Sequence, residues 1–321
     1  MLLPKKHPKV TSIRRWTIAL LLAGLVFGAG GAWLLPAWMP TAIAYAPNFG
    51  KQPGVFPEAR AEQLDTWGIS QQLKVAVGPP SALLSVWIME PSRRPLQGTV
   101  LVLHGIRDSK DSMRGIGRLL AEGGYPSVLI DLRGHGSSTG DWLTYGVLDS
   151  WDLTQVLDAL DPQNLLSEPV GVFGCSYGAA TAIQLAGRDP RIQAVVAVAP
   201  FATLQVAVHS YARLLGLGFV LPKAMIDQAI RDAGYIANFQ PSEANPLKAI
   251  RQTHARVLLI HGTADWKIPS TSSQQLHAAA PSHSRLILVE KAGHDSVMAA
   301  VQGNSKKEIL EWLGSSSAGS N

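Results

Sequence analysis

Six short, nearly continuous hydrophobic runs, rich in Val, Ile and Leu, recur from residue 98 onward. They cover residues 98–103, 127–130, 169–173, 194–198, 257–260 and 286–289. Runs of this length and composition predict strands that are buried on both faces of a sheet. Segments of helical composition lie between them, at residues 112–122, 150–160, 177–186 and 272–280. The alternation of strand and helix predicts an α/β fold, with a mostly parallel sheet and helices on both of its faces.

Two features depart from this alternation. Residues 73–77 and 83–89 are separated by Gly-Pro-Pro-Ser, which predicts an antiparallel pair at one edge of the sheet. Residues 200–255 are too long for a single crossover and contain two predicted helices, near 204–217 and 222–235. Because this insertion is markedly apolar, we expect a helical cap. Its side chains either cover a pocket for a hydrophobic group or pack the inserted helices onto the body.

The start of the chain differs in character from the rest. Residues 16–35 carry no charge, and a helix of that length would span the ~30 Å hydrocarbon layer of a membrane. The basic residues precede this run, which predicts a single-pass anchor within residues 1–36, with a cytoplasmic N-terminus and the body outside. A cleaved signal peptide is the alternative, because Ala42-Ile43-Ala44 offers small residues for cleavage, and the protein would then be secreted.

Residues 36–60 contain five prolines, which a continuous helix or a central strand does not tolerate. We therefore expect a linker or an extended arm over residues 37–69. The main domain is predicted to cover residues 70–313, and the Gly/Ser-rich end at residues 314–321 is expected to be a flexible tail.

Charge is concentrated near the N-terminus. Apart from five basic residues before residue 37, the chain carries 23 basic and 23 acidic residues, so the body is formally neutral. A neutral body offers no basic surface for nucleic acid, which we exclude as a partner. The single cysteine, Cys175, cannot form an intrachain disulfide and does not identify the compartment. The histidines lack the HExxH pattern or paired spacing, so neither a metal nor a cofactor is expected.

The pentapeptide Gly174-Cys175-Ser176-Tyr177-Gly178 lies between a hydrophobic run and an alanine-rich helical segment. This order predicts a strand, a sharp turn and a helix, with Ser176 in the turn. Glycines two residues before and after the serine allow the strand and the helix to approach closely. The unpaired N–H groups at the start of the helix would point at the space in front of the hydroxyl, where negative charge develops during acyl transfer.

A serine nucleophile needs a base and a carboxylate that orients the base. Asp265 follows the run at 257–260 within His-Gly-Thr-Ala-Asp, and His294 follows the run at 286–289 within Ala-Gly-His-Asp. Both therefore lie on loops at the carboxyl ends of predicted strands, as Ser176 does. Asp295 is the main rival for the acid role, but adjacent side chains seldom point at each other as His294 would require.

These segments together resemble the α/β-hydrolase family, whose catalytic residues follow the order nucleophile, acid, histidine. The resemblance covers roughly residues 70–313, and it implies the roles of nucleophile, acid and base for Ser176, Asp265 and His294. His-Gly-Ile-Arg at residues 104–107 resembles the oxyanion loop of the family. The resemblance implies that the backbone N–H groups of Ile106 and Tyr177 stabilise the oxyanion.

Other polar residues have structural interpretations that compete with chemical ones. His104 and His261 precede glycines at strand ends, where a hydrogen-bonded structural role is favoured over a role as base. Asp131 and His135 belong to a segment that resembles the loop after the fourth strand of the family, and we expect them to stabilise a turn. Cys175 is one residue before the nucleophile position and is interpreted as buried filler.

The sequence therefore predicts a membrane-anchored serine hydrolase of the esterase or lipase kind. It would cleave an ester, a thioester or a similar acyl bond of a small, hydrophobic substrate through an acyl-enzyme. Two alternatives stay open. A peptidase of the same fold, similar to proline-type aminopeptidases, would need an acidic pocket residue that holds the substrate amine. A non-catalytic binding protein would keep the fold without the chemistry.

Overall fold

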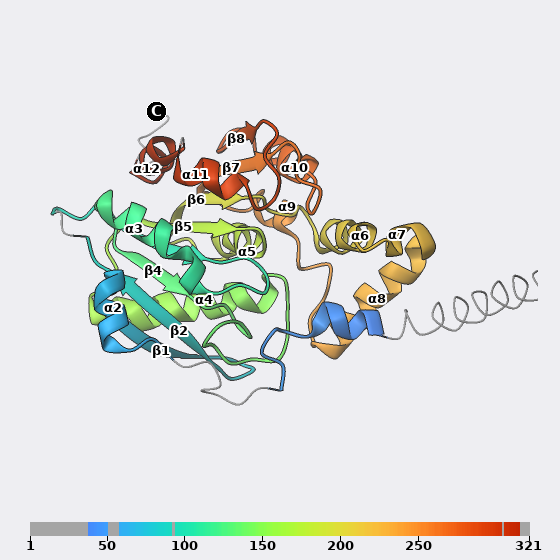
Figure 1. Cartoon of the computed structure of the whole chain (residues 1–321), viewed down its shortest axis with the longest axis horizontal. Helices are drawn as coiled ribbons and strands as arrows, with labels where there is room; N and C mark the ends of the chain where they lie inside the picture. Colours follow the sequence, from blue (N-terminus) through green and yellow to red (C-terminus); the bar gives the residue numbers. More distant parts are fainter. Residues whose placement is uncertain (1–37, 51–57, 92–93, 304, 315–321) are drawn as a thin grey trace, which may run out of the picture.

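The computed structural model describes residues 38–50, 58–91, 94–303 and 305–314. Within them one sheet of eight strands has the order β1-β2-β4-β3-β5-β6-β7-β8 (Figure 1). The strands are β1 (Gln71–Val77), β2 (Ala82–Met89), β3 (Thr99–Leu103), β4 (Ser127–Ile130), β5 (Val170–Cys175), β6 (Ile192–Val198), β7 (Arg256–Gly262) and β8 (Ser284–Val289). Strand β2 pairs antiparallel with β1 and β4, and every later neighbour pairs parallel. The prediction of a mostly parallel α/β sheet is confirmed.

Helices cover both faces of this sheet because successive residues of its central strands point to opposite sides. Leu101 and Leu103 belong to one buried cluster and Val100 and Val102 to the other. The first cluster is covered by α4 (Val147–Leu160), α5 (Tyr177–Ala186) and α10 (Thr271–Ala279). The second is covered by α2 (Ala61–Trp67), α3 (Arg114–Glu122), α11 (Val297–Gln302) and α12 (Lys306–Gly314). Short 3-10 helices occupy Lys110–Met113 and Asp161–Gln163.

The long connection between β6 and β7 is helical. It contains α6 (Leu204–Leu214), α7 (Leu217–Val220), α8 (Lys223–Ile236) and α9 (Pro246–Ala249). Helices α6, α7 and α8 extend to one side of the sheet in Figure 1, and α9 lies against the body. The hydroxyl of Thr203 caps α6 by accepting from the N–H of Val206. A contact of 2.7 Å between His209 Nε2 and Asp227 Oδ1 joins α6 to α8. Helices α6, α7 and α8 therefore form one packed unit beside the body, whereas α9 packs on α5 and α10.

The segment that was expected to be an extended arm holds two helices in its described part. Residues 38–44 are helical, and α2 follows after Pro57. Met39, Ile43 and Ala44 are buried against the main core. The apolar side chains of these residues pack onto the body, which the abundance of proline did not reveal.

The predicted anchor at residues 16–35 lies outside the described residues, as does the end of the predicted tail. In the part of the chain that the structure describes, no helix is both long and apolar enough to cross a bilayer.

Candidate active site

Ser176 lies in a strained turn between β5 and α5. Its backbone has φ 52° and ψ −112°, a conformation that L residues rarely adopt. The two flanking glycines are required by close backbone contacts. A Cβ on Gly178 would lie 2.5 Å from the carbonyl oxygen of His104, and a Cβ on Gly174 would overlap the carbonyl of Gly178. The turn therefore needs glycine at both positions to hold the serine where it is.

His294 joins Ser176 to Asp265. Its Nε2 lies 2.9 Å from Ser176 Oγ, and its Nδ1 lies 2.6 Å from Asp265 Oδ2. With Nδ1 protonated, His294 donates to the carboxylate, and Nε2 is free to accept from the serine hydroxyl. The three side chains come from loops after β5, β7 and β8, because parallel strands bring their carboxyl ends to one edge of the sheet.

The Asp265 carboxylate is held in place by several donors. Oδ1 accepts from the backbone N–H groups of Lys267 and Ile268, each at 2.9 Å. Nε2 of His261 lies 3.2 Å from Oδ2, the oxygen that His294 also contacts. Burial alone would raise the pKa of Asp265, but the hydrogen bonds from His261, His294 and Ile268 outweigh it and hold this pKa well below its usual range. Asp265 is therefore an anion at neutral pH.

Asp295, the alternative acid that the sequence offered, is directed at Lys267 and not at His294. Its side chain is 80% exposed and forms an ion pair with Lys267 at 2.7 Å. The carboxylate that contacts His294 is that of Asp265.

The two expected oxyanion donors flank the serine. Ile106 and Tyr177 line the same cavity as Ser176. Tyr177 is the first residue of α5, so its N–H has no partner four residues earlier in the helix. Among the described residues, none accepts a hydrogen bond from the N–H of Ile106. Both N–H groups are therefore available to a substrate oxygen.

The loop that carries Ile106 is fixed by buried polar contacts. His104 accepts from the N–H of Leu132 at 3.0 Å through Nε2, so its Nδ1 carries the proton and donates to the carbonyl of Gly105 at 2.7 Å. His104 is fully buried, and its role is structural, as the sequence favoured. It ties the loop after β3 to the loop after β4.

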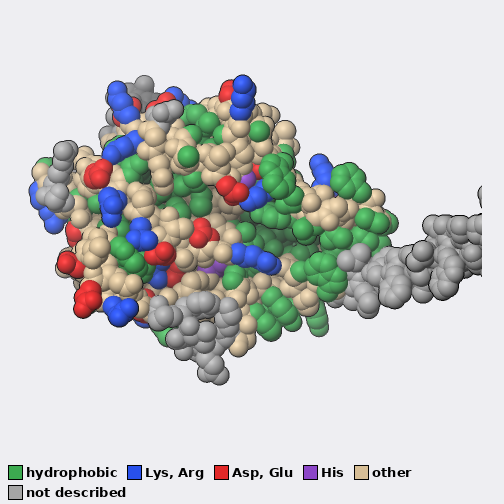
Figure 2. Space-filling model, viewed as in Figure 1, with side chains coloured by type: hydrophobic (Ala, Val, Ile, Leu, Met, Phe, Trp, Pro, Cys, Tyr) green, Lys and Arg blue, Asp and Glu red, His purple; other side chains and the backbone are tan. Residues whose placement is uncertain are grey.

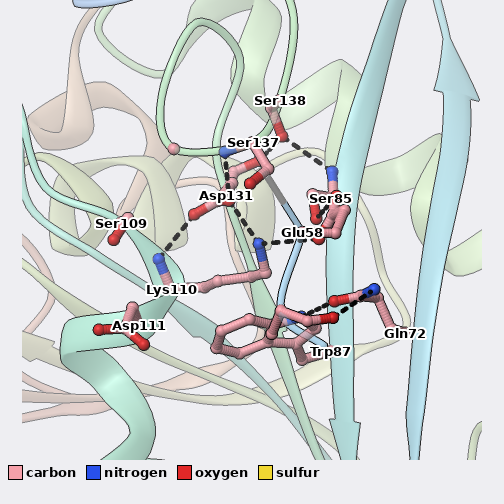
Figure 3. A network of polar contacts seen from close by, with 12 residues as sticks. Glu58, Gln72, Ser85, Trp87, Ser109, Lys110, Asp111, Asp131, Ser137 and Ser138 are labelled. Atoms are coloured by element: carbon pink, nitrogen blue, oxygen red, sulfur yellow. Dashed lines mark hydrogen bonds and ion pairs between the residues drawn. The ribbon is translucent and has the colours of Figure 1, made fainter. Parts of the chain in front are cut away.

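A buried ion pair secures the same two loops (Figure 3). Lys110 Nζ lies 2.6 Å from Asp131 Oδ2, and the backbone N–H of Lys110 donates to Oδ1 of the same carboxylate at 2.7 Å. The N–H of Ser137 also donates to Asp131, and the Lys110 ammonium lies 4.4 Å from the centre of the Trp87 ring. Asp131 thus stabilises turns, and it does not approach Ser176.

Comparison with known proteins finds a family model and several relatives. A family model described as serine aminopeptidase, S33, matches residues 94–244. The chain is 27% identical over 236 residues to the uncharacterized protein YfhR of Escherichia coli strain K12, covering 71% of this chain and 74% of that protein. It is 28% identical over 220 residues to the uncharacterized protein YqkD of Bacillus subtilis strain 168, covering 67% and 70%.

Solved structures share the fold. The Pyrococcus furiosus esterase Pf2001 has a TM-score of 0.64 and 22% identity, with 81% of this chain and 96% of that chain covered. Est1E from Butyrivibrio proteoclasticus has a TM-score of 0.57 and 16% identity, with 77% and 100% covered. The chain has the α/β-hydrolase fold. The matched family model includes Ser176 and the loop of Ile106 and ends before Asp265.

In this α/β-hydrolase fold, Ser176 opens into a cavity of about 570 Å³. Three parts of the chain line it: the helix at residues 38–44, helices α6 and α7, and the loops beside the serine. Nearly all the lining side chains are apolar or aromatic, and they include Trp38, Met39, Ile43, Tyr145, Phe201, Val208, Tyr211, Leu214, Leu217 and Ile268. Figure 2 shows hydrophobic side chains around a hollow beside these helices.

Two contributions to the site were missed by sequence reasoning. The helix at residues 38–44 supplies a cavity wall, although the sequence placed it in an arm. His261 was interpreted as structural, and its contact with Asp265 links it to the site. Its other nitrogen lies 2.7 Å from Ser273 Oγ, so the hydroxyl donates to Nδ1 and Nε2 carries the proton. In the sequence, only the position of His261, four residues before Asp265, could have indicated this contact.

Cys175 immediately precedes Ser176 in the chain. Burial raises the pKa of the Cys175 thiol to about 12, and its sulfur faces Met113 at 4.0 Å. Within the described ranges, no cluster of three or more acidic, His or Cys side chains is arranged to hold a metal ion.

Proposed function

We propose that this protein is a serine hydrolase that cleaves an ester, a thioester or a similar acyl bond. The observation that carries the proposal is the continuous hydrogen-bonded set from Ser176 through His294 to Asp265 at the wall of an apolar cavity. A serine hydroxyl beside a neutral imidazole, itself oriented by an ionised carboxylate, is the arrangement that activates serine for acyl transfer.

In the proposed reaction, Ser176 Oγ attacks the substrate carbonyl while His294 Nε2 takes the hydroxyl proton. His294 then gives this proton to the leaving group, and the acyl group stays on Ser176 as an ester. A water molecule, deprotonated by His294, attacks that ester and releases the acid. Asp265 keeps the imidazole in the required tautomer and stabilises the imidazolium that forms in both halves of the reaction.

The tetrahedral oxygen would be stabilised by the backbone N–H groups of Ile106 and Tyr177. One such donor is worth ~3–4 kcal/mol of transition-state stabilisation. Because these donors belong to the backbone, replacing the Ile106 side chain would not remove them. The loop contacts of His104 and Lys110 support the proposal, since they fix one donor relative to the serine.

The cavity favours a hydrophobic acyl group. Its volume lies within the ~300–1,000 Å³ of ordinary small-molecule sites. Apolar walls on three sides would take a hydrocarbon chain out of water, at about 25 cal/mol per Å² of apolar surface. An esterase-like substrate is also consistent with the name of one structural neighbour, the Pyrococcus furiosus esterase Pf2001.

A peptidase is the second candidate, and the description of the matched family model favours it. An aminopeptidase needs an acidic side chain that holds the substrate amine. Among the described residues, neither Asp nor Glu lines the cavity beside Ser176. The cavity therefore fits an acyl ester better than a charged amine. A non-catalytic binding protein is disfavoured because it has no use for the aligned Ser176, His294 and Asp265.

Labelling by a fluorophosphonate and a substrate panel test this proposal together. The panel consists of p-nitrophenyl esters from acetate to palmitate and aminoacyl p-nitroanilides. We expect labelling of the wild type and ester hydrolysis that increases from acetate to medium-length chains. Hydrolysis of the anilides alone would favour the peptidase, and absence of both labelling and turnover would favour a binding protein.

We also propose that residues 1–36 attach the protein to a membrane, with the catalytic domain on the extracytoplasmic side. The support is the uncharged run at residues 16–35 and the basic residues before it. Extraction of membranes with alkaline carbonate tests the attachment: the full chain should stay with the membrane. Release of a shorter chain into the medium would favour the signal peptide instead.

A further inference from the structure

Large apolar side chains are exposed at the mouth of the cavity. Trp38 is 43% exposed, Leu215 66%, Phe219 82% and Val220 69%. We call these four residues the apolar rim. Trp38 and Leu215 also line the cavity, and Phe219 and Val220 belong to α7 immediately beyond the lining residue Leu217. Figure 2 shows hydrophobic side chains gathered over this end of the molecule.

Isolated exposed apolar residues are normal, but a group beside a binding cavity marks an interaction surface. The cap does bury other apolar side chains of α6 and α8, such as Val208, Ile226 and Ile230. The exposure of the rim residues is therefore not a general property of the cap. Leu215, Phe219 and Val220 are instead exposed at the α7 end of the cap, and Trp38 is exposed at the first described residue.

The chain before Trp38 indicates what covers the rim. The uncharged run ends at Leu35, three residues before Trp38. Three residues span at most about 11 Å even when fully extended. If residues 16–35 enter a membrane, the rim must lie close to the surface of that membrane. Two exposed cations accompany it: Arg107 lines the cavity, and Arg213 lies against Gly218 of α7.

We propose that the apolar rim docks onto the lipid bilayer and that the substrate is an acyl lipid that enters the cavity from it. This rests on the proposed function, since it names the substrate class of the same site. Apolar side chains at a bilayer surface bury their area among the acyl chains, and arginines beside them contact lipid phosphates. An acyl chain that leaves the bilayer past Trp38 and Leu215 remains in apolar surroundings until its carbonyl reaches Ser176.

Docking is tested without reference to catalysis. The full chain, as Val220→Cys or Gln163→Cys, is labelled with a fluorescent dye and placed in phosphatidylcholine vesicles that contain 5-doxyl phosphatidylcholine. Gln163 is an exposed control in the 3-10 helix between α4 and the start of β5. The native thiol of Cys175 is only partly exposed, and its raised pKa of about 12 keeps it protonated, so the dye should not label it. We expect the doxyl lipid to quench the dye at residue 220 at least about threefold more than the dye at residue 163.

Equal quenching at both positions would overturn the docking proposal. A dye at residue 220 that is shielded from water but not quenched would also overturn it, because a second copy of the chain or residues 1–37 would then cover the rim. Shielding that increases with protein concentration would identify a second copy, and shielding that does not change with concentration would identify residues 1–37.

The substrate class is tested with 4-methylumbelliferyl palmitate in the same vesicles and 4-methylumbelliferyl acetate in water. We expect Phe219→Ser with Val220→Ser to lower turnover of the vesicle-borne palmitate about tenfold and to leave acetate turnover unchanged. Leu83→Ser, at an exposed position on β2, is the control and should change neither. Equal loss with both esters, or no loss with either, would contradict the inference. If the wild type cleaves neither ester, the proposed function fails, and the quenching result still decides the docking.

Discussion

His261 Nε2 lies 3.2 Å from Asp265 Oδ2, the same oxygen that lies 2.6 Å from His294 Nδ1. The carboxylate is thus held from two sides by imidazoles, one of which faces the serine. The carbonyl of Ile268 also accepts from His261, at 3.0 Å. His261 is therefore a positioning residue, which acts on the serine only through Asp265 and His294.

Replacing His261 should reduce the rate of the chemical step. We expect His261→Leu to lower kcat about tenfold with little change in KM, because a misplaced Asp265 orients His294 poorly. His261→Gln keeps an N–H donor and should retain more activity. Steady-state kinetics on an ester, with thermal unfolding as a check of folding, measures this. A KM effect alone, or equal losses in both variants, would contradict a positioning role.

His135 should make the protein less stable in acid. Burial, with a smaller effect of His104, lowers the pKa of His135 from 6.5 to about 3. Since the unfolded chain takes up a proton below pH 6.5 and the folded one does not, the folded state loses stability as pH falls from 6.5 towards 3. The loss approaches about 1.4 kcal/mol per pH unit for one group.

The matched variant is His135→Asn, whose amide can donate to the carbonyl of Arg133 as His135 Nδ1 does. Urea unfolding at several pH values should show a free energy of unfolding that falls more steeply for the wild type than for His135→Asn. Parallel curves for the two proteins would show that His135 is not the group responsible.

Gly178→Ala should disrupt the turn at Ser176. The added methyl group would lie 2.5 Å from the carbonyl oxygen of His104, and backbone atoms would have to move. We expect a loss of about 2 kcal/mol or more in unfolding free energy, together with loss of activity. Gly115→Ala is the control, because its methyl group would meet only the flexible side chain of Gln302. Unfolding and ester hydrolysis of both variants check this.

Cys175 should be dispensable. Its thiol, with a pKa of about 12, stays protonated at neutral pH. We expect Cys175→Ala to keep the wild-type kcat within about threefold, and iodoacetamide to leave the wild-type rate unchanged. Inactivation by iodoacetamide that Cys175→Ala abolishes would instead place the thiol in the reaction.

The residues of the candidate site were predictable because each follows a hydrophobic strand. Once the strands were recognised, a parallel sheet had to bring Ser176, Asp265 and His294 to one edge. Asp265 was also preferred over Asp295 on local grounds, since adjacent side chains point apart. The structure brings together the residues that this reasoning selected.

Contacts between distant parts of the chain were not predictable in the same way. Trp38 and Met39 lie among prolines, and nothing near them in the sequence indicates a cavity whose other wall is α6. The ion pair of Lys110 with Asp131 depends on how two loops meet. Hydrophobic periodicity reports burial within one element, and it does not say which distant element covers it.

The acyl-enzyme on Ser176 is the central claim, and mass spectrometry tests it most directly. The protein is mixed with p-nitrophenyl butyrate, quenched in acid within the first turnovers and digested. We predict that the peptide containing Ser176 gains one butyryl group in the wild type, and that Ser176→Ala, folded as judged by thermal unfolding, gains none and has lost at least about 10³-fold in kcat. A Ser176→Ala protein that still hydrolyses the ester at the wild-type rate, or a butyryl group on another residue, would contradict the account.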